Sequence, residues 1–211
     1  MSFIRTVLGD IKPEELGICY AHEHVIIDPS YTTQCFPDFL LDSVGRGIEE
    51  LTRFYESGGR AMVDSMPCAS GRNVVKLAEI SRGTGVHILC PTGLHLEKYY
   101  PEGSWGARLS VNELTNLFVA DIEEGIDAND YAGPTCQRTS HRAGLIKVAG
   151  GLDRLNDHEK KRFEAAARAH TKTGAPILTH TEKGTAALEQ VEILKSFGVD
   201  PAHVILSHTA R

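Results

Sequence analysis

Near its amino end the chain reads Gly17-Ile18-Cys19-Tyr20-Ala21-His22-Glu23-His24-Val25-Ile26-Ile27, an apolar run that carries two histidines one residue apart. Alternate side chains of a strand share one face and lie about 7 Å apart, so His22 and His24 can hold one metal ion from the same side. Two histidines at a strand end can equally form hydrogen bonds to loop backbone. The run therefore predicts a strand and leaves a metal site as one of two interpretations.

Further β-rich runs follow this one, and helical patterns separate them. The predicted strands cover residues 18–27, 61–67, 86–93, 144–150, 175–181 and 203–209. The predicted helices cover residues 43–57, 71–82, 110–126, 157–173 and 185–197. Ser110 and Glu113 have the spacing of a capping box, and Gly174 and Gly198 follow the ends of two helices. Near-continuous apolar strands that alternate with helices predict a parallel sheet covered by helices.

Polar residues mark the carboxyl ends of nearly all these strands. They are His22, His24, Asp64, Thr92, Lys147, His180 and His208. A doubly wound sheet concentrates such residues at one switch point, whereas a (β/α)8 barrel gathers all strand ends around one mouth. No Gly-x-Gly turn of a nucleotide site follows the first strand. The sequence therefore predicts an α/β fold of the (β/α)8 TIM-barrel type, with about six βα units in one domain that covers residues 1–211.

Composition and charge exclude several classes of partner. The net charge of −6 provides no basic surface for nucleic acid. The amino end lacks the apolar stretch of a signal peptide, and no run approaches the about 20 apolar residues of a membrane span. The five cysteines are scattered without a Cys-x-x-Cys pair, which argues against a disulfide framework and a zinc knuckle. We expect a cytoplasmic protein that binds neither nucleic acid nor membrane.

Lys147 is unusual because it lies in the middle of the apolar run of residues 144–150. A lysine in this position either extends its ammonium group to the barrel mouth or is held neutral. A neutral amine beside metal ions can react with carbon dioxide to give a carbamate, an anionic ligand that can bridge two cations. His180 and His208 would then complete a second metal site. The residues by themselves leave both alternatives open.

Four segments of the chain resemble the phosphotriesterase family of the amidohydrolase superfamily, which includes lactonases. They are Tyr20-Ala21-His22-Glu23-His24, Arg142-Ala143-Gly144-Leu145-Ile146-Lys147-Val148-Ala149, Leu178-Thr179-His180-Thr181-Glu182-Lys183-Gly184-Thr185 and Ile205-Leu206-Ser207-His208. The resemblance implies two divalent metal ions, usually zinc. It assigns His22 and His24 to one ion and His180 and His208 to the other. It also implies that Lys147 is carboxylated and bridges both ions.

The resemblance also implies an activity and a substrate class. It indicates a hydrolase of ester bonds whose small-molecule substrate is a lactone, such as a phosphorylated sugar lactone, or a phosphotriester. Two metal ions can activate water and polarise the carbonyl or phosphoryl oxygen of such a substrate. His95, Arg142 and Lys183 are the candidates for substrate contacts, although Arg142 and Lys183 can equally be solvated surface charges. Asp64 either caps a helix or orients a ligand histidine.

One expected catalytic group has no counterpart in the sequence. Family members carry an aspartate at the end of an eighth strand, and this chain stops at Arg211, shortly after the sixth, so we assign no catalytic residue. Ala210 stands where members often have an acidic residue, and it cannot relay a proton. A complete barrel needs about 250 residues. The alternative is therefore a catalytically inactive, truncated barrel with a metal-binding or assembly role, whose open strand edges another copy in a homo-oligomer could cover.

Overall fold

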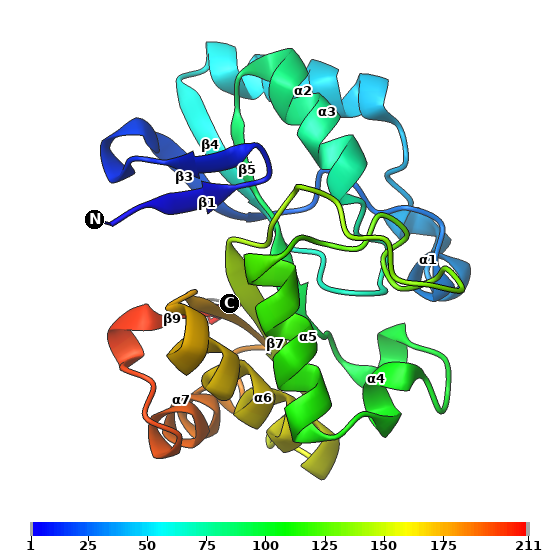
Figure 1. The fold of residues 1–211 in the computed structure, drawn as a ribbon, viewed down its shortest axis with the longest axis vertical. Coiled ribbons are helices and arrows are strands. Elements are labelled where there is room, and N and C mark those ends of the chain that lie inside the picture. Colours follow the sequence, from blue (N-terminus) through cyan, green and yellow to red (C-terminus); the bar gives the residue numbers. More distant parts are fainter. Residues whose placement is uncertain (1, 210–211) are drawn as a thin grey trace.

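The computed structural model describes residues 2–209 and shows parallel strands that pair in chain order (Figure 1). The first parallel sheet consists of β3 (Ile18–Glu23), β4 (Gly59–Asp64) and β5 (His87–Leu89). The second consists of β6 (Pro91–Gly93), β7 (Leu145–Gly150), β8 (Ile177–Thr181) and β9 (Val204–Ser207). Ala210, for which we predicted no role in proton transfer, lies outside the described residues, as does Arg211.

The two sheets join at Cys90. This residue divides the predicted strand 86–93 into β5, which pairs with β4, and β6, which pairs with β7. Pro91 lacks an N–H group for the ladder and stands at the first position of β6, where a strand tolerates proline. β3, β4, β5 with β6, β7, β8 and β9 thus give six successive strand positions, as the sequence predicts.

Helices flank both sheets. They are α2 (Val44–Glu56), α3 (Val74–Thr84), α5 (Val111–Glu123), α6 (Asp157–Thr173) and α7 (Ala187–Ser196). In Figure 1, α2 and α3 lie beside the first sheet, and α5, α6 and α7 lie beside the second. The predicted capping box of α5 is confirmed, because the Ser110 N–H donates to Glu113 Oε2 at 2.8 Å and the Glu113 N–H donates to Ser110 Oγ at 3.3 Å. None of the helices within residues 2–209 is long and apolar enough to cross a membrane.

Several short elements were not predicted. They are the antiparallel hairpin β1 (Ile4–Thr6) and β2 (Gly9–Ile11), the helices α1 (Tyr31–Cys35) and α4 (Trp105–Arg108), and the 3-10 turns η1 (Pro13–Glu15), η2 (Pro37–Phe39), η3 (Glu97–Tyr99) and η4 (Pro201–His203). Elements of three to five residues are too short to show a periodic pattern. The hairpin is fixed to the first sheet through Val7, whose N–H donates to Ile88 O at 2.8 Å. His203 belongs to η4, so the predicted strand 203–209 begins one residue later and ends at Ser207.

The main apolar core lies between the strands and the flanking helices. It includes Ile88, Ile146, Phe118 and Phe163, all fully buried. A second, smaller cluster consists of Val63, Leu145 and Leu178, from β4, β7 and β8. Lys147 and His180 lie two residues beyond Leu145 and Leu178, so strand alternation places all four side chains on the same inner face.

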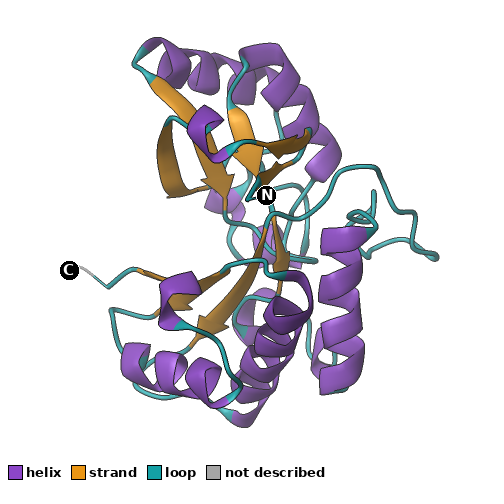
Figure 2. Cartoon of the chain, turned by 60° about the vertical axis from the view of Figure 1, so that its left-hand side comes forward, coloured by secondary structure: helices purple, strands orange, loops and turns teal. Residues whose placement is uncertain are grey.

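The series of strands is open between β3 and β9. These two strands are the ends of the series within residues 2–209, and no ladder joins them. Ile18 and Tyr20 of β3 and Ile205 of β9 are exposed. A cavity of about 480 Å³ lies between the two strands, lined by residues such as Ala21 and Leu206. In Figure 2 the longer helices lie above, below and to the right of the strands, and the strands face the open left-hand side.

Candidate metal centre

Four histidines that the sequence places at strand ends lie next to one another. His22 is on β3 and His24 follows it, whereas His180 is on β8 and His208 follows β9. The ring centroid of His22 lies 5.7 Å from that of His24 and 4.7 Å from that of His208. The His180 and His208 centroids are also 4.7 Å apart. The imidazoles therefore form one continuous cluster, although more than 180 residues of sequence separate the first from the last.

Lys147 reaches this cluster from β7. Its side chain is only 1% exposed, and Nζ lies 3.4 Å from Nε2 of His22. The lysine therefore lies buried beside the imidazoles and does not extend to solvent. Burial lowers the Lys147 pKa from 10.5 to about 7, although the nearby Asp64 carboxylate acts in the opposite direction. A large share of the amine is thus neutral near pH 7.

The imidazoles are held neutral as well. Burial, followed by the Lys147 cation, lowers the pKa of His22 from 6.5 to about 3. The same two causes lower the pKa of His24 and of His180 to about 4, and they lower that of His208 too. Neutral rings keep a lone pair available, which a metal ligand requires.

The hydrogen bonds of the rings show which nitrogens face the cluster. His22 places Nδ1 2.9 Å from Ser207 Oγ and turns Nε2 toward Lys147. His180 places Nε2 3.4 Å from Glu182 Oε1. Nδ1 of His24 is buried without a hydrogen-bond partner among residues 2–209. A metal ion would satisfy such an orphaned nitrogen, so the donor set fits a metal centre.

The histidine, cysteine and carboxylate side chains described near the cluster do not by themselves make up a recognisable metal site. Within residues 2–209, no three of them are arranged as a ready-made metal site. Structural and catalytic zinc ions take at least three protein ligands. Among the described residues, the imidazoles as arranged do not offer three such ligands to a single ion.

Asp64 has neither of the two roles predicted for it. Its Oδ2 accepts the Val25 N–H at 2.7 Å and the Ile26 N–H at 3.1 Å, and its Oδ1 accepts the Met66 N–H at 3.1 Å. The carboxyl group is fully buried, and this burial raises its pKa to about 6. Asp64 thus fixes the backbone that follows His24, instead of contacting a histidine ring or a helix end.

A cavity of about 330 Å³ opens over the cluster and is lined by His95, Tyr99, Phe39 and the four clustered histidines. His95 is buried with its ring centroid 4.8 Å from that of His180. Its Nδ1 accepts the Leu96 N–H at 2.8 Å. Because a backbone amide can only donate, the proton of a neutral His95 ring is on Nε2. The His95 ring therefore offers an N–H donor at Nε2. Because that nitrogen carries the proton, it is a poor metal ligand.

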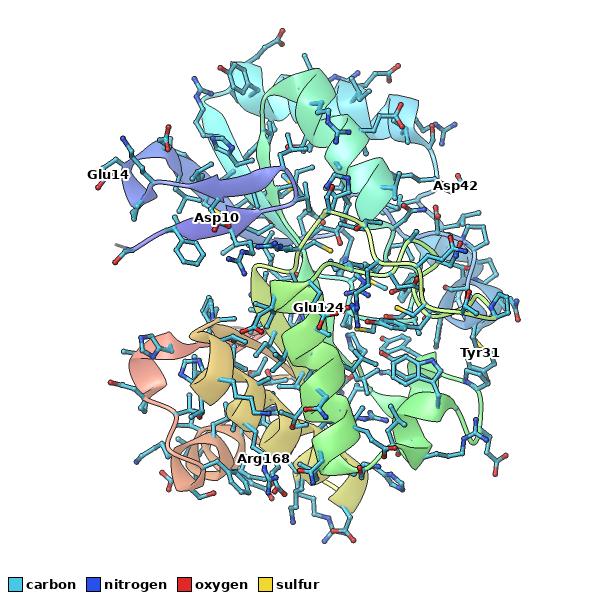
Figure 3. All side chains as sticks on the ribbon, viewed as in Figure 1. Asp10, Glu14, Tyr31, Asp42, Glu124 and Arg168 are labelled. Carbon is cyan, nitrogen blue, oxygen red and sulfur yellow. The ribbon has the colours of Figure 1, made fainter. Side chains whose placement is uncertain are left out.

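The other two predicted substrate contacts are not among the residues that line this cavity. Arg142 precedes the amino end of β7. The Arg5 hydrogen bond lowers the pKa of Asp10 on the hairpin, and the positive charge of Arg142 adds a smaller effect in the same direction. Figure 3 shows Asp10 on one side of the molecule and Tyr31 and Asp42, which follow β3, on the other. Arg142 is therefore at the wrong end of the strands for a substrate contact. Lys183 follows β8 at the correct end and is exposed.

Sequence reasoning missed several residues of the mouth. Lys98 Nζ donates to Glu182 Oε1 at 2.8 Å, so an ion pair joins the loops after β6 and β8. Phe39 stacks on Phe36 with centroids 5.3 Å apart, and Tyr99 meets His95 edge to face at 4.4 Å. These residues lie in loops and 3-10 turns, where no periodic signal marks them. The polar residues of segments 92–100 and 182–183 were the indication in the sequence for Lys98, Tyr99 and Glu182, and nothing indicated Phe36 or Phe39.

Comparisons with known proteins agree with this architecture. The phosphotriesterase family matches residues 2–211. The phospho-furanose lactonase of Mycoplasmopsis synoviae is 39% identical over 98% of this chain and 60% of its own length. The crystal structure of an amidohydrolase from Mycoplasma synoviae superposes with a TM-score of 0.94 at 39% identity, over 98% of this chain and 60% of the other. A lactonase from Listeria monocytogenes gives a TM-score of 0.88 at 33% identity, over 99% and 65%.

These likenesses confirm the predicted barrel type and the resemblance on which the sequence analysis relied. The chain spans about 60% of the length of the curated relatives it matches. The family match extends over residues 2–211 and includes every strand that carries a clustered histidine or Lys147. The chain therefore belongs to the phosphotriesterase family.

Proposed function

We propose that the protein is a metal-dependent hydrolase of ester bonds that acts on lactones, in particular on lactones of phosphorylated furanoses. The observation that carries the proposal is the buried Lys147 amine, 3.4 Å from Nε2 of His22 and surrounded by neutral imidazoles. The relatives named phospho-furanose lactonase support the substrate class. The family to which the chain belongs supports the reaction type.

The residues of the cluster would hold two divalent ions, and zinc fits their nitrogen donors. His22 and His24 would bind one ion, and His180 and His208 the other. Neutral Lys147 would attack carbon dioxide, with formation of an N–C bond and loss of one proton, and the resulting carbamate would bridge the ions. When bound, the ions supply polarisation of the ester carbonyl and a water of lowered pKa.

The chain's own side chains would orient the substrate in the 330 Å³ cavity. His95 would donate its Nε2 proton to an oxygen of the lactone, because its Nδ1 is already occupied by the Leu96 N–H. Phe39 and Tyr99 would pack against the apolar edge of the sugar ring and exclude water. Lys183, exposed on the loop after β8, would meet a phosphate group at the rim, where the Lys98–Glu182 ion pair joins the two loops.

Metal analysis tests the centre, with one lysine variant and one matched control. Purified under zinc, the chain is expected to hold about two ions, and Lys147→Met is expected to lose more than half of them because the bridging ligand is gone. Lys161→Met is the control, since this lysine binds backbone carbonyls of Ala107 and Leu109 outside the cluster. Unchanged zinc content in Lys147→Met would refute the proposed centre.

A substrate panel tests the reaction. The protein produced from its complete reading frame is expected to open lactones of phosphorylated furanoses faster than their unphosphorylated counterparts. Zinc binding without hydrolysis of any lactone or phosphotriester would contradict the hydrolase proposal. That result is the one expected of a catalytically inactive barrel that keeps its metal.

A further inference from the structure

Ser207, the last residue of β9, contacts the metal-binding cluster through its hydroxyl group. Its Oγ lies 2.9 Å from Nδ1 of His22, and the residue is 8% exposed. No strand pairing joins β3 to β9 within residues 2–209. The contact is therefore a side-chain link between the two ends of the strand series.

The backbone around Ser207 is held in place from β8. Ser207 pairs with His180 in the β8–β9 register, and its carbonyl oxygen accepts the Thr181 hydroxyl at 2.8 Å. His208 then adopts a left-handed conformation, with φ 59°. Strand alternation sends consecutive side chains to opposite faces, but this turn ends the alternation. As a result Ser207 and His208 both reach the ring of His22.

The two contacts of His22 suit the tautomer that carries its proton on Nδ1. Nε2 faces the Lys147 amine, which carries hydrogens and can donate, whereas the Ser207 hydroxyl can accept. With its ring proton on Nδ1, a neutral His22 donates to Ser207 Oγ and directs the Nε2 lone pair toward the hydrogens of Lys147. A metal ion bound through Nε2 needs this same tautomer, and partners at the remote nitrogen are what hold ligand histidines in orientation.

We infer that Ser207 is a positioning residue that fixes the tautomer and the ring orientation of His22 before metal binds. The inference rests on the proposed metal centre for its purpose, although the hydrogen bond itself does not depend on metal. Ser207 acts through His22 and does not contact the substrate. Its role differs from that of Asp64, which fixes backbone and not a ring.

The tautomer can be measured in the metal-free protein. Long-range 1H–15N correlation spectra are expected to show His22 protonated on Nδ1 in the native chain. In Ser207→Ala the partner of Nδ1 is lost, and the spectra are expected to show a mixture of both tautomers. His22 protonated mainly on Nε2 in the native chain, or the same tautomer in both proteins, would overturn the inference.

Zinc titration gives a second measurement. Ser207→Ala is expected to weaken zinc binding about 10- to 100-fold, and Ser207→Thr, which keeps the hydroxyl, is expected to restore it. Ser81→Ala is the matched control, because the buried hydroxyl of Ser81, on α3, donates to Val86 O at 2.7 Å and lies outside the cluster. Its zinc affinity is expected to equal that of the native chain, even if it loses stability.

The outcomes separate this inference from the proposed function. If the native chain binds zinc and Ser207→Ala binds it equally well, the positioning role is refuted while the metal centre stands. An equal loss of affinity in Ser81→Ala would also refute it, since general destabilisation would explain the effect. If the native chain binds no zinc, the proposed function fails, and the tautomer measurement alone decides the role of Ser207.

Discussion

At the scale of single residues, the cluster is a concentration of basic groups that cannot all be charged. Four imidazoles and one amine lie within contact distance of their neighbours, and both burial and mutual repulsion favour the neutral forms. Folding therefore brings together unprotonated nitrogens whose lone pairs are available to a ligand. This property follows from where the strands end, and it requires no unusual residue type.

The neutral state of the histidines predicts a pH dependence of stability. Burial and the Lys147 cation lower the folded-state pKa of His24 to about 4, below the 6.5 of the unfolded chain. As the pH falls below 6.5 the unfolded chain takes up the proton first, so the contribution of His24 to stability is complete above pH 6.5 and declines toward pH 4. Between pH 7 and 5 the expected loss is roughly 1–2 kcal/mol.

Urea denaturation of the metal-free chain at pH 7 and pH 5 checks this expectation. His24→Asn should lose less stability between the two pH values than the native chain does, because asparagine does not titrate. His158→Asn, which replaces an exposed imidazole, is expected to behave like the native chain. A native-like pH dependence in His24→Asn would show that His24 is not held neutral by the fold.

The sequence alone places these titrating residues, but not their hydrogen bonds. His22, His24, His180 and His208 could be predicted to converge because they lie at strand ends. The partners Ser207 and Glu182 could not be predicted, because each depends on a backbone turn beyond its strand. His208 and Lys183 both have left-handed backbone there, at φ 59° and 54°, and no residue type in those positions indicates it.

At the scale of elements, Lys147 is positioned by a close approach of two strands. Gly93 pairs with Lys147 across β6 and β7, with φ 107°. A Cβ atom on Gly93 would overlap the Lys147 carbonyl oxygen. That oxygen also accepts the Leu94 N–H at 2.9 Å. Only glycine therefore lets β7 lie at the distance that brings the lysine into the cluster.

Substitution of Gly93 tests this arrangement. Gly93→Ala is expected to lower the free energy of unfolding by more than about 3 kcal/mol, because backbone strain adds to the overlap with a backbone atom. Gly58→Ala is the control, since Gly58 has a similar φ of 100° but open space around it. It should cost about 1–3 kcal/mol. Chemical denaturation checks both, and equal losses would contradict the close approach.

The long connection between α5 and β7 shows where element-level prediction from sequence stops. Asp130 in this segment lies 2.8 Å from Nη2 of Arg72, whose Nη1 lies 3.0 Å from Oδ2 of Asp121 on α5. Arg72 is fully buried, so these carboxylates neutralise a charge that water cannot reach. Helices and strands could be predicted from periodicity. Arg72 is separated from Asp121 by 49 positions and from Asp130 by 58 positions, and ion pairs over such distances leave no periodic pattern in the sequence.

At the scale of the whole molecule, the order of the strands and the covering helices were predictable because each unit repeats the same apolar alternation. The barrel type was predictable because polar residues end strand after strand instead of gathering at one switch point. The hairpin β1–β2 was not, since its strands have three residues each. The position of Arg142 was not predictable either. The sequence shows that Arg142 precedes β7, but not that this end of the strand lies away from the cavity.

The most direct test of the account is the position of metal in the folded chain. Crystals of the zinc-loaded protein, measured at the zinc absorption edge, would reveal each ion by its anomalous scattering. We expect two anomalous peaks about 3.5–4 Å apart, enclosed by His22, His24, His180 and His208, with continuous density from Lys147 Nζ between them. Zinc bound only elsewhere on the molecule, with an unmodified Lys147 in the cluster, would contradict it.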